Sequence, residues 1–257
     1  MNPHSQAAVY SKENVVKHYV AAEGLQKPEQ IILKKLEDKL SNMTVLDMGI
    51  GGGRTTAYFA GKVKKYTGID FSEKMIEACK LKFEKKHPNI ELLTEDARNL
   101  SRFKNEEFDL VLFSFNGIDH IDHQERQQVL AEIRRICKKD GDFIFSSHNI
   151  FYVPNLSKVH FRFNIFKMLQ AVFKRSGFVT ANKIKLETWQ EKDHIILFDA
   201  MNDFGLHIYY TKPSFEAENL RRCGFKNIDV YDVNGVKINL AEEAGTGASP
   251  WLYYHCR

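Results

Sequence analysis

The sequence predicts an α/β protein with a doubly wound, mainly parallel seven-stranded sheet and an antiparallel β insertion after strand five. Three observations support this fold class. Strand-like and helix-like segments alternate from residue 44 to residue 149, and the alternation returns at residue 213. The fourth strand-like segment, FDLVLFSF, is almost continuously apolar, as expected for a parallel strand buried on both faces. A cluster of glycines follows the first strand, at the edge where such sheets bind ligands.

The individual elements follow from local patterns. Apolar residues recur at helical spacing in residues 10–40, where Pro28 begins the second of two helices. We expect strands at 44–49, 66–70, 90–96, 108–115 and 142–149, with helical crossovers at 54–63, 72–86 and 123–139. A helix at 214–225 and strands at 227–235 and 251–257 complete the sheet. Residues 1–150 and 213–257 are therefore expected to form one domain, in which residues 1–42 are a helical cap.

Residues 151–212 interrupt this alternation. The stretch 154–175 is basic and rich in aromatic residues, which predicts an amphipathic helix or a pair of helices. Three runs with alternating apolar residues follow at 183–190, 194–203 and 206–211, and turn residues between them predict a small antiparallel sheet. We expect this insertion to bind substrate or to form a homodimer interface.

Composition excludes several classes of protein. Hydrophobic residues make up 43% and charged residues 27%, as in ordinary globular proteins. No apolar run approaches the ~20 residues that a membrane helix needs, and the N-terminus lacks the features of a secretory signal. Four dispersed cysteines indicate reduced thiols, with no zinc site and no disulfide framework. We therefore expect a cytoplasmic protein without membrane contacts. The net charge of +4 is too small to indicate nucleic acid by itself.

The segment TVLDMGIGGGRTT, residues 44–56, predicts a nucleoside site. Its glycines let bare backbone approach a ligand, and the helix that follows begins with unpaired N–H groups. Asp70 ends the second strand, roughly 20 residues after Gly49, where a carboxylate can hold ribose hydroxyls. Arg54 stands at the sixth position, where a dinucleotide-binding turn carries glycine, which disfavours NAD. A P-loop is excluded because no G-K-[ST] follows the glycines.

Five segments, in this order, resemble the motifs of class I S-adenosylmethionine-dependent methyltransferases. They are VLDMGIGGGR, GIDFSEKMIEAC, TEDARNL, FDLVLFSFNGIDHI and CKKDGDFIFSSHN. The resemblance covers residues 30–150 by motif and 213–257 by pattern. It implies a Rossmann-like methyltransferase fold, S-adenosyl-L-methionine as cofactor and S-adenosyl-L-homocysteine as product. The inserted flap resembles the substrate-binding insertions of small-molecule members, including sugar N-methyltransferases.

The resemblance also implies the cofactor contacts. Asp70 would bind the ribose, Phe71 and Met75 would flank the adenine, and Asp96 would accept from its amino group, with Ala97 near the ring. The full set of expected cofactor-binding residues is Tyr19, Asp47, Gly49, Gly51, Arg54, Thr55, Asp70, Phe71, Met75, Asp96, Ala97, Arg98, Phe115 and Asn116.

Two of these residues have alternative roles. Asp47 either orders the ammonium group of the cofactor or only braces the glycine loop. Arg54 either reaches the carboxylate of the methionine tail or only begins the helix.

Methyl transfer is an in-line displacement that needs alignment and exclusion of water. A hydroxyl acceptor must lose a proton and an amine must arrive neutral, so a base is often present. The segment after strand four supplies our candidates: His120 first, then His123 and Asp119, and His148 follows from strand five. Each has an alternative role as a capping or hydrogen-bonding residue. We expect no metal, because nothing in the D-H-x-D-H spacing forces these side chains to converge.

The acceptor is expected to be a small metabolite, such as a sugar, a glycan precursor or a natural-product intermediate, methylated on N or O. Tyr10, Tyr152, Trp189 and Tyr209 are our candidates for its contacts. Two alternatives stay open. The basic residues Lys158, Arg162, Lys167, Lys174 and Arg175 favour an RNA or protein methyltransferase, and a non-catalytic regulator that binds the cofactor would carry the same motifs.

Overall fold

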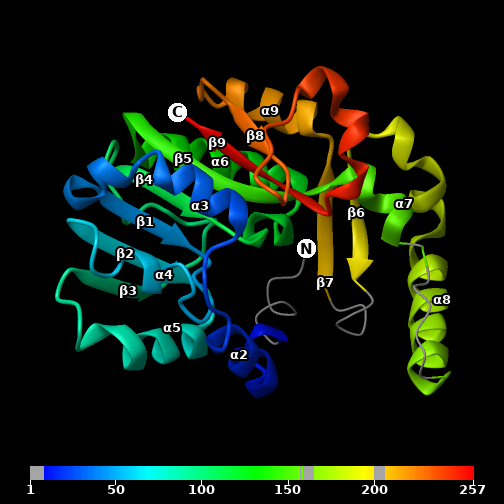
Figure 1. Cartoon of the computed structure of the whole chain (residues 1–257), viewed down its shortest axis with the longest axis horizontal. Coiled ribbons are helices and arrows are strands. Elements are labelled where there is room, and N and C mark those ends of the chain that lie inside the picture. Colours follow the sequence, from blue (N-terminus) through cyan, green and yellow to red (C-terminus); the bar gives the residue numbers. More distant parts are fainter. Residues whose placement is uncertain (1–8, 157, 159–164, 200–205) are drawn as a thin grey trace.

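A nine-stranded sheet runs through the middle of the molecule in the computed structural model, which describes residues 9–156, 158, 165–199 and 206–257 (Figure 1). The strands are β1 (Thr44–Met48), β2 (Lys65–Asp70), β3 (Ile90–Thr94), β4 (Phe108–Phe113), β5 (Cys137–Asn149), β6 (His194–Asp199), β7 (Leu206–Thr211), β8 (Asp229–Tyr231) and β9 (Trp251–Cys256). Strands β3, β2, β1, β4 and β5 pair in that order and are parallel. Strand β9 pairs antiparallel with both β5 and β8. The predicted, mainly parallel sheet of seven strands is confirmed in β1 to β5, β8 and β9, and β6 and β7 of the predicted insertion bring the total to nine.

Helices cover both faces of this sheet (Figure 1). They are α2 (Glu13–Val20), α3 (Lys27–Lys34), α4 (Thr56–Phe59), α5 (Glu73–Cys79), α6 (His123–Ile136), α7 (Val153–Leu156), α8 (Ile165–Thr188) and α9 (Pro213–Arg222). Shorter helical turns are η1 (Glu37–Asn42), η2 (Lys80–Glu84), η3 (Gly117–His120), η4 (Ile150–Tyr152), η5 (Trp189–Glu191) and η7 (Leu240–Ala248). Across the described residues, no helix combines the length and the hydropathy of a membrane span.

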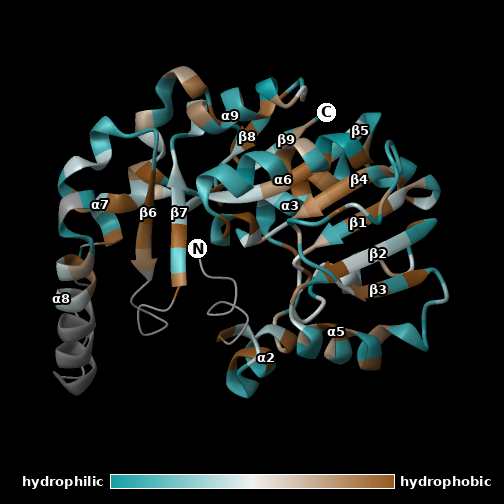
Figure 2. Cartoon of the chain, turned by 180° about the vertical axis from the view of Figure 1, so that it is seen from behind, coloured by the Kyte–Doolittle hydropathy of each residue, from teal (hydrophilic) through white to brown (hydrophobic). Residues whose placement is uncertain are grey.

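Alternate residues of the central strands feed two separate cores. In β4, Val111 packs into the core that α6 and α9 cover, whereas Leu110 and Leu112 pack into the core beneath α3, α4 and α5. Figure 2 shows β4 as largely hydrophobic and the visible side of α6 as largely hydrophilic. The continuous apolar run of β4 therefore has its expected cause, because both faces of the strand are buried.

Strands β6 and β7 extend the sheet at one end of β5. Strand β9 occupies one edge of β5 as far as His148, and β4 occupies the other edge only as far as Phe145. Strand β7 pairs in parallel with His148 and Asn149, so it continues the edge that β4 leaves open. Strand β6 then pairs antiparallel with β7, which confirms the antiparallel insertion after strand five.

The prediction of a strand at residues 183–190 is wrong. These residues form the end of α8 and the turn η5. Asn182 explains why this segment is helical and not a strand. Its side-chain oxygen accepts from the backbone N–H of Phe198, and its amide nitrogen donates to the carbonyl of Phe198. The helix thus satisfies backbone groups of β6 that a further strand would otherwise have paired.

Candidate cofactor and acceptor site

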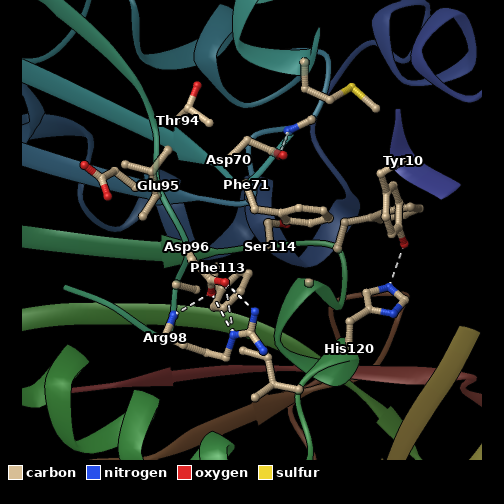
Figure 3. A pocket seen from close by; sticks show the side chains of 18 of the residues that line it. Tyr10, Asp70, Phe71, Thr94, Glu95, Asp96, Arg98, Phe113, Ser114 and His120 are labelled. Carbon is tan, nitrogen blue, oxygen red and sulfur yellow. Dashed lines mark hydrogen bonds and ion pairs between the residues drawn. The ribbon is translucent and has the colours of Figure 1, made fainter. Parts of the chain in front are cut away.

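A cavity of about 410 Å³ opens at the carboxyl ends of β1, β2, β3 and β4 (Figure 3). It is lined by Tyr10, Tyr19, Gly49, Gly51, Ile69, Asp70, Phe71, Met75, Thr94, Glu95, Asp96, Ala97, Arg98, Asn99, Phe113, Ser114, Phe115, Gly117, His120 and Ile121. This is the edge where ligands bind in open parallel sheets. Ten of the fourteen expected cofactor-binding residues line this cavity; Asp47, Arg54, Thr55 and Asn116 do not.

The glycine loop forms one wall of the cavity. Gly49 and Gly51 have φ of +65° and +53°, which side chains other than glycine rarely adopt. A Cβ atom on Gly51 would lie 3.0 Å from Cδ1 of Tyr19, so the ring of Tyr19 packs directly against bare backbone. The chain stays in this loop through Arg54, and α4 begins at Thr56 rather than at Arg54 as predicted. Helix α2 therefore covers the loop because the loop carries no side chains at these positions.

Asp70 lies at the end of β2 and is only 6% exposed. One carboxylate oxygen accepts from the backbone N–H of Gly51 and the other from that of Ser72, both at 2.9 Å. Burial raises the pKa of Asp70, although these two hydrogen bonds oppose the rise. A carboxylate has about four acceptor positions, so two remain for ligand hydroxyls.

Asp96 and Arg98 form a second polar group on the opposite wall. The guanidinium and the backbone N–H of Arg98 both donate to the Asp96 carboxylate, the latter at 2.9 Å. Desolvation would raise the pKa of Asp96, but the hydrogen bonds from Arg98 outweigh it and hold the pKa below its usual value. The apolar side chains of Phe71 and Met75 line the same cavity, the first 38% exposed and the second buried. This wall suits a flat aromatic ring.

Asp47 lies beneath the glycine loop instead of in the cavity. It is buried, it accepts from the hydroxyl of Tyr66 at 2.8 Å, and it is hydrogen-bonded to Thr55. Burial raises the pKa of Asp47 to about 7, despite the hydrogen bonds from Thr55 and Tyr66. Thr56 bonds the same tyrosine at 2.7 Å. This geometry supports the bracing role for Asp47 over contact with a ligand.

Arg54 is held by Glu29 of α3. Two guanidinium nitrogens donate to the two carboxylate oxygens at 2.6 and 2.8 Å, and Glu29 is fully buried. The hydroxyl of Ser114 also bonds this carboxylate. Glu29 therefore joins α3 both to the glycine loop, through Arg54, and to the loop after β4, through Ser114.

The turn after β4 is conformationally strained. Phe115 and Asn116 have φ of +55° and +63°, a region that bulky residues seldom adopt. Phe115 is 44% exposed and lines the cavity, whereas Asn116 is 6% exposed and lies behind it. Strain of this kind clusters at functional sites.

Of the four candidate catalytic residues, His120 alone lines the cavity. It lies on η3, and its Nε2 is 2.7 Å from the hydroxyl of Tyr10 (Figure 3). The ring of Tyr10 also packs edge-on against Phe71 and Tyr19. Tyr10 therefore links the N-terminal segment to η3 across the rim of the cavity.

Asp119 and His148 form a buried pair behind the turn. One oxygen of the fully buried Asp119 is 2.7 Å from both Nδ1 and the backbone nitrogen of His148. The other oxygen accepts from Arg126 at 2.9 Å and from Ser147 at 2.6 Å. Desolvation would raise the pKa of Asp119, but its bond to His148 and the charge of Arg126 hold it below its usual value.

Arg126 itself is fully buried and bridges two acids. It donates to Asp119 and, at 2.8 Å, to Glu216 of α9. Its pKa is raised, because these two negative charges outweigh the effect of desolvation. Sequence reasoning missed Arg126 and Glu216, and no local signal distinguishes them from the other charged residues of their helices.

His123 faces away from the cavity. Its Nδ1 is 2.8 Å from the hydroxyl of Tyr209, and its ring stacks on His194 with centroids 4.1 Å apart. Burial and the neighbouring His123 lower the pKa of His194 to about 4. Within the described part of the chain, no three His, Cys, Asp or Glu side chains are placed to hold a metal ion.

The candidate acceptor contacts are dispersed. Tyr10 lines the cavity, whereas Tyr209 is fully buried and joins His123. Trp189 packs edge-on against Phe151 in the small core of the insertion, and Tyr152 is half-buried in η4. Arg162 lies outside the described residues, as do the side chains of Lys167, Lys174 and Arg175.

Several lining residues were not named as site residues from the sequence, among them Thr94, Glu95, Asn99, Phe113 and Ser114. All five lie within the segments TEDARNL and FDLVLFSFNGIDHI. Their place in the cavity could have been predicted from their position after a strand, since the carboxyl end of every parallel strand reaches the same edge of the sheet.

Comparison with known proteins agrees with this geometry. A family model described as a methyltransferase domain matches residues 45–141. The uncharacterized protein MJ1252 of Methanocaldococcus jannaschii is 30% identical over 186 residues, which are 71% of this chain and 67% of that protein. A ubiquinone biosynthesis O-methyltransferase of Coxiella burnetii is 26% identical over 207 residues, covering 75% and 82% of the two chains.

A solved structure shows the same fold. The 1,6-didemethyltoxoflavin-N1-methyltransferase of Burkholderia thailandensis superposes with a TM-score of 0.61 at 18% identity, covering 100% of this chain and 90% of that chain. This chain belongs to the class I S-adenosylmethionine-dependent methyltransferases. It is an enzyme that uses S-adenosyl-L-methionine, and the cavity fits that cofactor because an acid with two remaining acceptor positions stands beside an apolar wall.

Proposed function

We propose that this enzyme methylates N or O of a small metabolite in the cavity at the carboxyl ends of β1 to β4. The observation that carries the proposal is the contact between Tyr10 and His120, 2.7 Å apart. This contact spans part of the rim of the cavity, which favours an acceptor small enough to fit beneath it and disfavours a polymer.

Bound S-adenosyl-L-methionine would supply an electrophilic methyl group on a sulfonium. We assign the ribose to Asp70, whose carboxylate is already oriented by Gly51 and Ser72. Phe71 and Met75 would pack on the adenine, and Asp96 with Arg98 would lie at its polar edge. The bare backbone of the glycine loop then faces the methionine tail.

The relatives support a small acceptor. One is named for ubiquinone biosynthesis and methylates oxygen, and another is named for N1 methylation of 1,6-didemethyltoxoflavin. This chain covers 82% of the first protein and 90% of the second. We further propose that residues 151–212 supply acceptor contacts and a homodimer interface. Gel filtration of the intact chain would test the homodimer.

Isotope transfer tests the proposed function. The protein is incubated with S-adenosyl-L-methionine carrying a labelled methyl group, and with cell extract separated into metabolites, RNA and protein. We expect label in a product of the metabolite fraction. Label confined to RNA or protein would instead support the alternative macromolecular acceptors, and binding without transfer would support a regulator.

A further inference from the structure

We propose that His148 and Asn116 form the acceptor subsite, and that it takes a planar aromatic or heteroaromatic molecule bearing an N–H or O–H group. The proposal rests on the proposed methyltransferase function and deepens it. Phe115 lines the cofactor cavity and its ring centroid is 5.9 Å from that of Trp251, so the subsite adjoins the cavity at the Phe115–Asn116 turn.

Asp119 sets the tautomer of His148. Because an ionised carboxylate only accepts hydrogen bonds, the 2.7 Å contact makes Nδ1 the donor and leaves a lone pair on Nε2. A second bond from the same oxygen to the backbone of His148 fixes the ring to β5. The side chain is 19% exposed, so the imidazole is not sealed from solvent. Such an imidazole is oriented to act as a base.

The charged and titratable groups around His148 come from three elements. Asp119 lies on η3, Tyr210 on β7 has its ring centroid 5.0 Å from the imidazole, and Arg126 on α6 lies behind Asp119. The carboxylate of Asp119 contacts the imidazole directly, whereas the guanidinium of Arg126 lies behind Asp119 and is also paired with Glu216.

His120 and His123 are already engaged elsewhere. His120 Nε2 contacts Tyr10 at the rim of the cavity, and His123 Nδ1 of α6 contacts the hydroxyl of Tyr209 of β7. The carboxylate partner therefore distinguishes His148 as the base.

Unsatisfied polar atoms mark the ligand position. Within the described residues, the side-chain oxygen of Asn116 and the indole nitrogen of Trp251 are buried without a hydrogen-bond partner. Such atoms are costly unless a ligand or water bonds them. The amide nitrogen of Asn116 is 3.5 Å from Nε2 of His148, so the two side chains share one location. A ligand with one donor for the Asn116 oxygen and one acceptor for the Trp251 nitrogen would satisfy both of these buried atoms.

Aromatic rings surround the same location. The ring centroid of Trp251 is 5.9 Å from that of Phe115 and 6.3 Å from that of His148. Together with Tyr210, these rings favour a flat, apolar ligand body. The left-handed conformation of Asn116 turns its side chain toward β5, which gives the strained turn a function.

The step balances as follows. A lone pair on the acceptor nitrogen or oxygen forms the new bond to the methyl carbon, while the bond from that carbon to sulfur breaks and its electron pair stays on sulfur. The proton of the acceptor moves to Nε2 of His148 and then to solvent.

Trp251 offers a binding test that needs no turnover. In a Trp189→Phe background Trp251 is the sole tryptophan, and the protein is saturated with S-adenosyl-L-homocysteine. Phenol, aniline and imidazole are titrated as aromatic probes, with glucosamine as a non-aromatic amine. We expect saturable quenching by aromatic probes, and in Asn116→Gly an affinity reduced about fivefold, as for one neutral hydrogen bond. Glycine suits the left-handed backbone of this position, so the loop conformation is retained.

Quenching by glucosamine alone, or equal affinity in Asn116→Gly, would overturn the aromatic subsite. Calorimetry with S-adenosyl-L-homocysteine is expected to give the same affinity for both proteins. A loss of that affinity would instead place Asn116 in the cofactor site and contradict the proposal.

The base is tested by the loss of rate. Initial rates of S-adenosyl-L-homocysteine formation are measured with dilute metabolite extract, for the wild type, His148→Gln and the control His87→Gln. We expect His148→Gln to lose roughly 100-fold or more of the wild-type rate, because an amide cannot take up the proton of the acceptor, and His87→Gln to keep that rate. Retention of the wild-type rate in His148→Gln would refute the assignment. If even the wild type forms no product, the proposed function fails, whereas the quenching experiment still tests the subsite.

Discussion

Replacing Asp70 by asparagine should abolish most of the affinity for the cofactor while leaving the fold intact. The carboxylate accepts two backbone N–H groups and, by our assignment, two ribose hydroxyls. Asparagine keeps one oxygen, but its N–H₂ group faces a backbone N–H of Gly51 or Ser72, where donor meets donor. The lost charge-assisted bonding is about 2–3 kcal/mol, which corresponds to a roughly 30- to 150-fold weaker affinity.

Calorimetric titration with S-adenosyl-L-homocysteine measures this loss directly. Glu91→Gln is the matched control, since Glu91 lies on the neighbouring strand β3, pairs with Lys65 and does not line the cavity. Thermal unfolding of both variants separates loss of binding from loss of fold. An affinity within threefold of the wild type in Asp70→Asn would refute the assignment of the ribose to Asp70.

Three further outcomes follow from the buried and rim contacts. Because the pKa of Asp47 is raised to about 7 in the folded state, the unfolded state binds fewer protons than the folded state between about pH 4 and pH 7. The free energy of unfolding should therefore fall as the pH rises through that range, and it should fall less in Asp47→Asn, as denaturant titrations would show. Arg126→Met leaves two buried carboxylates without their cation and should lower the free energy of unfolding by about 3–5 kcal/mol. The exposed control Arg222→Met should lower it by less than about 1 kcal/mol, and equal losses in urea titrations would contradict this. Tyr10→Phe removes one hydrogen bond to His120, so S-adenosyl-L-homocysteine should dissociate up to about tenfold faster in stopped-flow measurements, and an unchanged rate would argue against closure of the rim.

The cofactor half of the site was predictable because its signals are local. Each strand of a parallel sheet delivers its carboxyl end to one edge, so Asp70 and Asp96 could be placed together from strand patterns alone. The partner of Arg54 could not be found in this way. Glu29 reaches it from α3, across a junction that only the packed structure defines.

The acceptor half depends on contacts between distant segments. Asp119 and His148 could each be named from the sequence, but their contact arises because β4 ends early and η3 folds back onto β5. The strand predicted at 183–190 failed for a similar reason. Its alternating apolar pattern was real, but the tertiary bond between Asn182 and β6 favours helix there.

A crystal structure of the protein with S-adenosyl-L-homocysteine tests the central claim most directly. We predict both ribose hydroxyls within hydrogen-bonding distance of the Asp70 carboxylate, the adenine against Phe71 and Met75, and the sulfur facing the Phe115–Asn116 turn. A ribose bound away from Asp70, or a sulfur directed away from that turn, would contradict the account.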